Sequence, residues 1–332
     1  MAKRRILGVD VGRESLKLAL VSEGRVEKAA VASMPNNLVK EGRVVSVETL
    51  GELIRSTMKE AGIRANAAAY VLSSESVYLH NTVMPRMTEE QLMYNIPYEL
   101  EDYITDELKN YVFDYAMLSR PEELAADESA GMELLVAAVP IRVIDEVRDL
   151  LYQAGLKLVK CAPAESAYVS LIRRLEELHQ GYGEYSILDL GSSAIRLLMF
   201  NGDRHMVTRA LDIGLADLDR TIADAYSVDI HLAHTYLITD YDGCQRKEPC
   251  LNAYNSIAVE LMRAMNFYRF SNPDSRVEDL WICGGGAVIE PLREAISATL
   301  DMRIHFAEEL LPEGVPPEAA HTMVQAVGIT MD

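Results

Sequence analysis

Two stretches of the chain place one short polar turn between two apolar runs, in the same order. Leu7 to Val21 and Ile187 to Phe200 each predict an apolar strand, an Asp-x-Gly turn and a second apolar strand. The turn aspartates are Asp10 and Asp189, so the repeat has an offset of 179 residues (189 − 10 = 179). A duplication at this spacing predicts that the chain has two related halves.

Around these hairpins, apolar residues at helical spacing alternate with short apolar runs, which is typical of an α/β protein. The runs predict strands at residues 26–33, 67–72, 77–83, 111–118, 132–139, 156–161, 280–283 and 303–306. The helical spacing predicts helices at residues 49–61, 88–104, 141–154, 163–178, 215–226, 230–239, 252–270, 290–299 and 319–327.

Residues 77–156 interrupt this order with strand, helix, two strands and helix, which predicts a small inserted α+β module. The first helix of the module begins with a capping-box-like Thr88-Glu89-Glu90-Gln91. Pro97 lies inside this helix, and we expect it to kink or divide the helix. The acidic residues 121–131 are expected to form a hairpin tip.

Composition narrows the class of protein. A length of 332 residues suggests two domains, and a net charge of −19 argues against a nucleic-acid-binding surface and against attachment to anionic lipid. No apolar run is long enough to span a membrane, and charged residues break up the N-terminal strand where a signal peptide would be apolar. Four cysteines lack the paired spacing of a zinc site, so reduced thiols of a cytosolic protein are expected: Cys161, Cys244, Cys250 and Cys283.

The glycine turns carry the candidate chemistry. A glycine lets the backbone approach a ligand closely, and the N–H groups of such a turn form an anion-binding concavity. An aspartate at the end of a strand can orient metal-bound water, because hard cations prefer oxygen ligands. The strand at 280–283 runs into Gly284, Gly285 and Gly286, where a nucleoside or phosphate could lie against the backbone. The alternative for each turn is an ordinary tight β-turn or a close contact between helix and strand.

Two Asp-x-Gly hairpins followed by a Gly-Gly-Gly turn resemble the actin-like ATPase superfamily, and within it the PilM family of type IV pilus assembly. The resemblance rests on residues 8–17 (GVDVGRESLK), 214–226 (GLADLDRTIADAY), 283–292 (CGGGAVIEPL) and 325–329 (QAVGI). The inserted module fits as well, and the similarity spans nearly the whole chain.

The resemblance implies an α/β fold of the actin-like (ribonuclease H-like) kind, with two lobes and a small α+β module inserted in the first. The first lobe would comprise residues 1–77, 157–182 and 319–332, the protein-docking module 78–156, and the second lobe 183–318. We expect hinges near residues 181–183 and 312–317. The last helix is expected to return and pack on the first lobe.

The resemblance also implies ATP or ADP with Mg²⁺ in the cleft between the lobes. Asp10 and Asp189 would act on the metal through water, Lys17 would lie near the phosphates, and Glu165 would orient an attacking water. The expected nucleotide-binding residues are Asp10, Gly12, Ser15, Lys17, Asp189, Gly191, Ser192, Ser193, Gly284, Gly285 and Gly286.

The sequence departs from the family at several of these places. Of three hydroxyl residues that usually follow the first Asp-x-Gly, only Ser15 is present, beside Arg13 and Glu14. Ile195 and Leu237 stand where the family has polar residues. We therefore expect a nucleotide-binding scaffold whose hydrolysis, if any, is slow.

Two candidate residues have simpler interpretations. Glu165 could be a solvated acid at a helix N-terminus, which is worth about 0.3–1 kcal/mol through the helix dipole. His231 and His234 lie three residues apart, a spacing that suits a metal, but no third ligand is evident and a surface position is favoured.

The resemblance implies a partner, the cytoplasmic tail of a PilN-like membrane protein, which would recruit the chain to the inner face of the cytoplasmic membrane. An extended tail would lie along a sheet edge with its apolar side chains in pockets. By resemblance the groove lies between the first lobe and the module. We expect it to use residues 78–83 and the helix carrying Tyr94, Ile96 and Tyr98, although these aromatics could instead be core. Pilus motor ATPases and self-association remain open as further contacts.

Two other functions fit the same fold. A sugar or acid kinase needs a catalytic carboxylate and a pocket in the first half, where this chain has the module. Turnover of ATP with small hydroxyl acceptors would identify a kinase. An FtsA-like cell-division ATPase would carry a C-terminal membrane helix, which is not expected because the sequence stops at Asp332, just after the last helix.

Overall fold

The computed structural model describes residues 5–35, 38–40, 42–119, 124–125, 131–179 and 183–331. It separates into two compact units, Met1–Ser170 with Gln325–Asp332, and Leu171–Val324. Most of the expected acidic tip at 121–131, and the first two residues of the expected hinge at 181–183, lie outside the described residues. Among the described residues, no helix combines the length and apolar character needed to cross a membrane.

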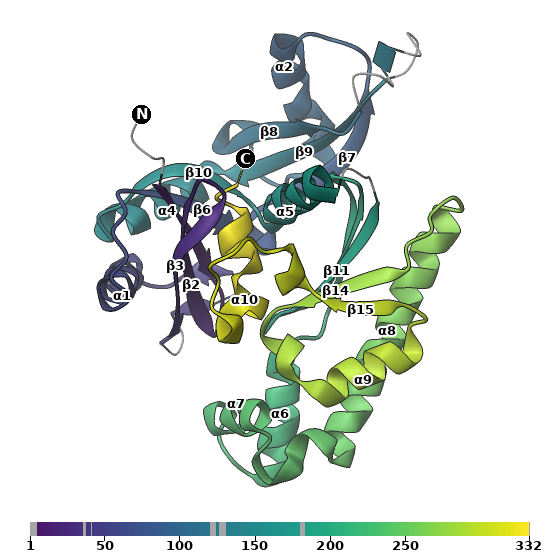
Figure 1. Ribbon diagram of the computed structural model, residues 1–332. Helices are drawn as coiled ribbons and strands as arrows, with labels where there is room; N and C mark the ends of the chain where they lie inside the picture. The colour runs from purple at the N-terminus through teal and green to yellow at the C-terminus, as the bar shows by residue number, and fades with distance from the viewer. Residues whose placement is uncertain are drawn as a thin grey trace. The chain divides into compact units, whose positions relative to one another are not determined.

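The first unit is built on a mixed five-stranded sheet in the order β10-β6-β1-β2-β3 (Figure 1). Its strands are β1 Arg5–Val11, β2 Ser15–Ser22, β3 Arg25–Ser33, β6 Ala67–Leu72 and β10 Lys157–Pro163. The strands β1, β2 and β3 pair antiparallel, whereas β6 pairs parallel with β1 and with β10. The aspartate of the first hairpin, Asp10, pairs with Lys17 across β1 and β2.

Two helices cover the apolar core of this sheet. In α1, Val47–Glu60, the side chain of Ser46 caps the N-terminus by accepting from the Thr49 N–H, and Leu50 and Ile54 are fully buried. The helix α4, Ile141–Gln153, contributes Val147, Leu150 and Leu151 to the same core. Residues 141–156 were expected in the inserted module from the sequence, whereas the apolar stripe of α4 packs in the core of the large sheet.

The C-terminal end of the chain packs in the first unit. The helix α10, Pro317–Gly328, enters this unit at Gln325, whose side-chain amide donates to the hydroxyl of Tyr168 at 3.0 Å. Tyr168 lies on α5, Ala164–His179. The side chain of Lys160 donates to the carbonyl of Met331 at 2.8 Å. These contacts join β10 and the beginning of α5 to the last residues of the chain.

The inserted module has its own sheet and core. Its strands β7 Tyr78–Met84, β9 Met132–Pro140 and β8 Tyr111–Met117 pair antiparallel in the order β7-β9-β8. The helix α2, Glu89–Glu99, has the expected capping box and buries Leu92 and Ile96 in this core. Pro97 lies within α2, which ends two residues later at Glu99, before the end at residue 104 that the sequence predicted.

The second unit repeats the topology of the first sheet in the order β13-β12-β11-β14-β15. Three strands pair antiparallel, β11 Glu184–Leu190, β12 Ile195–Asn201 and β13 Arg204–Leu211, and two follow in parallel, β14 Asp279–Cys283 and β15 Arg303–Phe306. The strand β13 was not expected from the sequence, because polar residues interrupt its apolar pattern. The helices of this unit are α6 Leu215–Tyr226, α7 Ile230–Thr239, α8 Glu248–Ser271 and α9 Glu290–Thr299.

This repeat is the structural counterpart of the sequence duplication. Asp189 pairs with Arg196 across β11 and β12, as Asp10 pairs with Lys17 across β1 and β2. In both units the hairpin is followed by a third antiparallel strand on one side and by parallel strands on the other. The duplicated α/β architecture predicted from the sequence is confirmed.

Candidate functional site

The turn of the first hairpin is compact and electrically balanced. The Gly12 N–H donates to the carbonyl of Ser15 at 3.0 Å, which closes the turn between β1 and β2. A Cβ on Gly12 would come within 2.7 Å of Lys17 Nζ, so only glycine fits here without moving that ammonium group. Lys17 Nζ lies 3.1 Å from Asp10 Oδ2, and both side chains are nearly buried. The structure therefore brings four of the predicted residues together: Asp10, Gly12, Ser15 and Lys17.

The residues that depart from the family pattern point outward. The side chains of Arg13 and Glu14 form an ion pair of 3.4 Å and are 50% and 38% exposed. The charge of Glu14 is thus partly balanced and partly solvated. The electrostatic repulsion between Glu14 and an anion bound at the turn would therefore be weak, because water screens exposed ion pairs.

The turn of the second hairpin packs against the beginning of α6. The carbonyls of Gly191 and Ser192 accept from the N–H groups of Leu215 and Ala216, each at 3.1 Å. These N–H groups belong to the first turn of α6, where no helical carbonyl is available to them. The close approach requires Gly214, since a Cβ there would lie 2.2 Å from the Ser192 carbonyl oxygen.

The Gly-Gly-Gly turn lies directly beside this hairpin. Strands β11 and β14 are parallel neighbours with Asp189 opposite Cys283, so their carboxyl ends meet at one edge of the sheet. Gly284 has a φ of +87°, and a Cβ there would lie 2.6 Å from Asp189 Oδ1. A Cβ on Gly286 would lie 2.8 Å from the Cβ of Leu190. The second unit thus packs the predicted glycine turn directly against the end of β11, a contact that requires glycine at Gly284 and Gly286.

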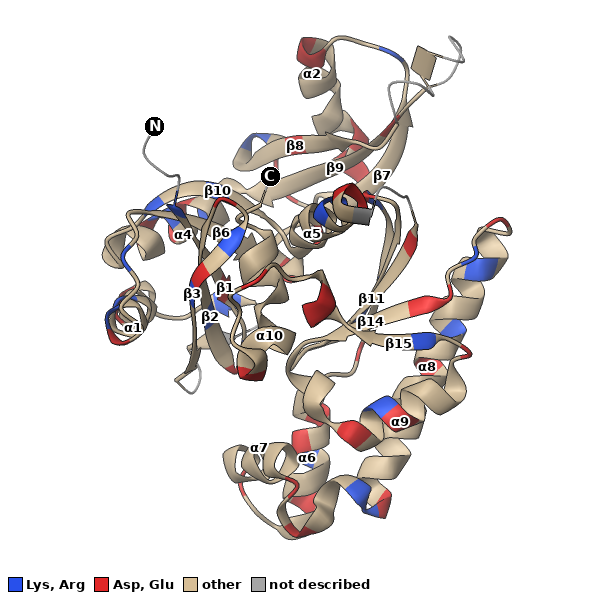
Figure 2. Ribbon diagram, viewed as in Figure 1, with Lys and Arg blue, Asp and Glu red and all other residues tan. Residues whose placement is uncertain are grey.

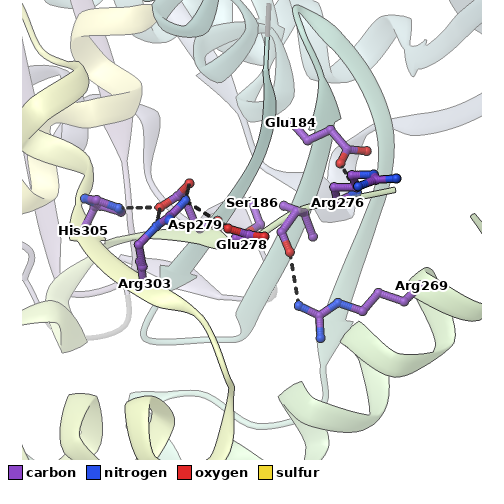
Figure 3. A network of polar contacts seen from close by, with 9 residues as sticks. Glu184, Ser186, Arg269, Arg276, Glu278, Asp279, Arg303 and His305 are labelled. Carbon is purple, nitrogen blue, oxygen red and sulfur yellow. Dashed lines mark hydrogen bonds and ion pairs between the residues drawn. The ribbon is translucent and has the colours of Figure 1, made fainter. Parts of the chain in front are cut away.

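A polar network fixes the strand that leads into the glycine turn (Figure 3). Asp279, at the start of β14, accepts two hydrogen bonds from Arg303 at 2.6 and 2.8 Å and pairs with His305 Nε2 at 2.8 Å. The backbone carbonyl of Asp279 accepts from the Ser186 hydroxyl on β11. The ring of Trp281, two residues along β14, stacks on His305 at 5.0 Å. These contacts hold β11, β14 and β15 in register.

Acid is expected to weaken this network in a predictable direction. The hydrogen bonds from Arg303, and then from His305, lower the pKa of Asp279 from 3.8 to about 2. The stabilisation is therefore complete above about pH 4 and is lost as the pH falls toward 2. We expect a loss of about 1 kcal/mol, since the Arg303 side chain is 65% exposed and water screens the pair. Urea denaturation of the wild type and Asp279→Asn should give a stability difference that narrows between about pH 5 and pH 2.5; a constant difference would contradict this.

Glu165 is not the solvated acid that one interpretation of the sequence allowed. Its side chain is in the first turn of α5 and only 3% exposed. The interpretation of Glu165 as a surface charge is therefore wrong. A buried carboxylate needs partners in the protein, so this residue is held by its surroundings and not by water.

His234 also has a partner that the sequence did not reveal. Its Nδ1 lies 3.0 Å from Asp219 Oδ2, and Asp219, on α6, is 3% exposed. The pair joins α7 to α6, so His234 has a structural contact. No group of three His, Cys, Asp or Glu residues that could hold a metal occurs in the part of the chain that the structure describes.

A sequence model of the family described as type IV pilus assembly protein PilM matches residues 8–312, which is 305 of the 332 residues (312 − 8 + 1 = 305). The chain belongs to the PilM family. A comparison with curated proteins gives no match.

Solved structures agree on the fold. The chain is similar to a structure titled PilM-PilN type IV pilus biogenesis complex, with 24% identity and a TM-score of 0.83, covering 98% of this chain and 97% of that one. Ethanolamine utilization protein EutJ from Carboxydothermus hydrogenoformans is 14% identical with a TM-score of 0.61, covering 99% and 90%. MreB5 of Spiroplasma citri bound to ADP is 11% identical with a TM-score of 0.53, covering 98% and 95%. The fold is therefore actin-like, as the sequence predicted.

Within this PilM-family fold, the sequence identified the hairpin and glycine turns, but not the side-chain contacts that hold the neighbouring strands and helices in place. Asp219 lies within residues 214–226, which resemble the family, but nothing in that stretch indicated its contact with His234, and Asp279 precedes the strand predicted at 280–283 without a motif of its own. A signal existed for Gly214, which precedes an apolar helix and stands in one of the stretches that resemble the family. The seven predicted residues of the second unit lie in the two adjoining turns: Asp189, Gly191, Ser192, Ser193, Gly284, Gly285 and Gly286.

Proposed function

We propose that this chain is a scaffold of type IV pilus assembly whose first unit binds the cytoplasmic tail of a PilN-like membrane protein. Membership of the PilM family supports the assembly role. The similar structure titled as a PilM-PilN complex supports the choice of partner. A cavity within the first unit is the observation that carries the proposal.

The cavity lies at the carboxyl ends of β1 and β6, beside the point where the chain enters the module. It has a volume of about 70 Å³, and α4 forms one wall. The opposite wall is a short hairpin of β4, Val39–Lys40, and β5, Arg43–Val44. The lining residues are Val11, Val39, Gly42, Arg43, Val44, Tyr70, Leu72, Ser73, Ser76, Arg142, Val143, Glu146, Val147 and Leu150.

The chemistry of the cavity suits an apolar side chain carried on an extended backbone. Valines and leucines form its apolar part, and Arg43 and Arg142 supply donors for peptide carbonyls at its edge. Burial, followed by the neighbouring Cys161, Asp10 and Glu146, raises the pKa of Tyr70, so this hydroxyl stays protonated as a donor.

The cavity is lined by residues that the sequence assigned to the first lobe and to the module, but not by residues 78–83 or by α2, which the expected groove used. Ile96 is fully buried in the core of the module and is therefore not part of a groove. Tyr94 and Tyr98 are exposed on the side of α2 away from that core. We therefore propose that the tail binds at the cavity between α4 and the β4–β5 hairpin, and not on α2.

Filling the cavity should weaken tail binding. Val143→Phe is expected to weaken binding of a synthetic PilN-type tail by about tenfold or more, because the larger ring occupies the space of the tail side chain. Val159→Phe is the matched control, since Val159 lies on β10, is 42% exposed and does not line the cavity. Fluorescence anisotropy with labelled tail measures both. Equal affinities for the two variants, or no binding by the wild type, would exclude the site.

We further propose that the turns bind ATP or ADP with Mg²⁺. In the second unit, the Gly284 backbone packs directly beside the carboxylate of Asp189, and glycines in a turn leave backbone N–H groups free of side chains for a phosphate or nucleoside. The Asp189 carboxylate is of the kind that holds hydrated Mg²⁺. In the first unit, Asp10 offers the same type of oxygen ligand, and Lys17 beside it supplies positive charge. The metal would neutralise phosphate charge when bound.

Calorimetric titration of the purified chain with MgATP tests this second proposal. Binding heat that disappears in Asp189→Ala would support it. No heat at millimolar nucleotide would exclude it and would leave the tail proposal untouched. Of the three hydroxyl residues expected in the first turn only Ser15 is present, which agrees with slow turnover.

The proposed partner also provides the route to the membrane. Recruitment of this chain to the inner face of the cytoplasmic membrane would then depend on the PilN-like protein. Deleting the gene for that partner should release the chain into the soluble fraction, and unchanged recruitment would contradict the proposal.

A further inference from the structure

The outer face of α2 is a surface that the proposed function does not use. Leu92, Ile96 and Leu100 face the module core and are at most 2% exposed. On the opposite side, Tyr94 and Tyr98 are 69% and 55% exposed. Their rings lie 5.9 Å apart, and a hydrogen bond between them raises the pKa of Tyr98. Two large aromatic side chains are thus presented to solvent in one place.

Carboxylates flank this aromatic pair along the chain. Glu90 precedes Tyr94 by four residues on α2, one helical turn away. Glu101 and Asp102 follow α2 in a short 3-10 helix, Glu101–Tyr103, and both are exposed. Between Arg86 and Lys109 the sequence has no lysine or arginine, as the colouring of α2 in Figure 2 illustrates. The same stretch holds seven carboxylates: Glu89, Glu90, Glu99, Glu101, Asp102, Asp106 and Glu107.

The ionised carboxylates of this stretch are hydrogen-bond acceptors and cannot donate. A complementary surface must therefore supply donors and positive charge.

The overall charge of the chain decides between a second copy and another protein. With a net charge of −19, two copies repel each other, and residues 87–108 bring no cation to offset that repulsion. An exposed aromatic pair with an acidic rim instead matches the usual anatomy of a binding surface for a cationic partner. Arginine is the best match, because its guanidinium group stacks on aromatic rings and pairs with carboxylates.

We propose that the outer face of α2 with the turn that follows it, made by Glu90, Tyr94, Tyr98, Glu101 and Asp102, docks an arginine-bearing basic surface of a partner protein. This contact is separate from the tail site, whose lining comes from β1, β6, α4 and the β4–β5 hairpin. The chain then connects two partners, one through the large sheet and one through the module.

The probe is a labelled helical peptide in which pairs of arginines alternate with pairs of leucines, titrated against the full chain. A lysine version carries the same charge without the planar stacking group. We expect the arginine peptide to bind about fivefold or more tightly than the lysine peptide. Tyr94→Ala/Tyr98→Ala should lose about tenfold in affinity, whereas Tyr94→Phe/Tyr98→Phe should retain most of it because the rings remain.

Matched charge variants separate this face from the general acidity of the chain. Glu101→Gln/Asp102→Asn should weaken binding, while Asp224→Asn/Glu248→Gln removes two exposed carboxylates of the second unit and should leave it unchanged. Equal losses in both pairs, equal affinity for the two peptides, or a change of oligomeric mass caused by Tyr94→Ala/Tyr98→Ala would overturn the proposal. Val143→Phe should leave peptide binding intact, so failure of the tail site is distinguishable.

Discussion

Replacing Gly8 by alanine is expected to destabilise the first unit by about 3 kcal/mol or more. Gly8 lies in β1 between its neighbours β2 and β6, paired with Ala19 and Ala69. A Cβ at this position would lie 1.7 Å from the carbonyl oxygen of Ala326 and 2.8 Å from its carbon. Both atoms are backbone of α10, so no side-chain rotation removes the clash. Either β1 or the end of α10 must move.

Gly24→Ala is the matched control in the same unit. Gly24 has a φ of +71°, but no atom lies within 4 Å of the position that an alanine Cβ would take, so its replacement should cost only the conformational strain of about 1–2 kcal/mol. Chemical denaturation gives the two stabilities, and hydrogen exchange of β1 and α10 shows where protection is lost. Similar costs for Gly8→Ala and Gly24→Ala would show that α10 does not hold β1 in place.

The sequence predicted the hairpins because their signal is local. Each combines an apolar strand, a tight turn and a second apolar strand, so register follows from the turn itself, and Asp10 and Asp189 took the expected places. The same reasoning missed β13, whose Arg204, His205 and Arg209 break the apolar pattern. This strand forms because it completes the ladder with β12, a pairing that the sequence of β13 alone does not specify.

The remaining differences between the predicted and the observed structure depend on tertiary contacts that the sequence does not reveal. The amphipathic stripe of α4 fits either the module or the large sheet, and only packing against α1 shows which core it joins. Tyr94, Ile96 and Tyr98 are all apolar enough for a core, and the helical turn separates buried Ile96 from the two exposed tyrosines. The cavity beside α4 was not predictable, because it depends on a hairpin of two short strands, β4 and β5, that carries no strong strand pattern.

The second large loss of stability is expected from a substitution in the glycine turn of the second unit, at Gly284. Gly284 combines a φ of +87° with a ψ of 174°, a backbone region that is nearly restricted to glycine. A Cβ there would also lie 2.6 Å from Asp189 Oδ1 and 2.7 Å from the carbonyl oxygen of Leu190. An alanine at this position would therefore suffer both backbone strain and steric overlap. The Gly284 N–H also donates to the carbonyl of His321 at 2.8 Å, which restrains the backbone here.

Gly284→Ala is therefore expected to destabilise the second unit by about 3 kcal/mol or more and to displace Asp189 from its place beside the turn. Gly285→Ala is the control one residue away, because a Cβ there meets only Leu215 Cδ1 at an ordinary 3.5 Å, and its cost should stay below about 1 kcal/mol. Urea denaturation followed by Trp281 fluorescence measures stability, and calorimetry with MgATP measures binding. Since the proposed nucleotide contact needs Asp189 and the glycine backbone together, Gly284→Ala should lose both stability and binding heat. A stable Gly284→Ala protein with unchanged nucleotide heat would remove the glycine turn from the proposed site.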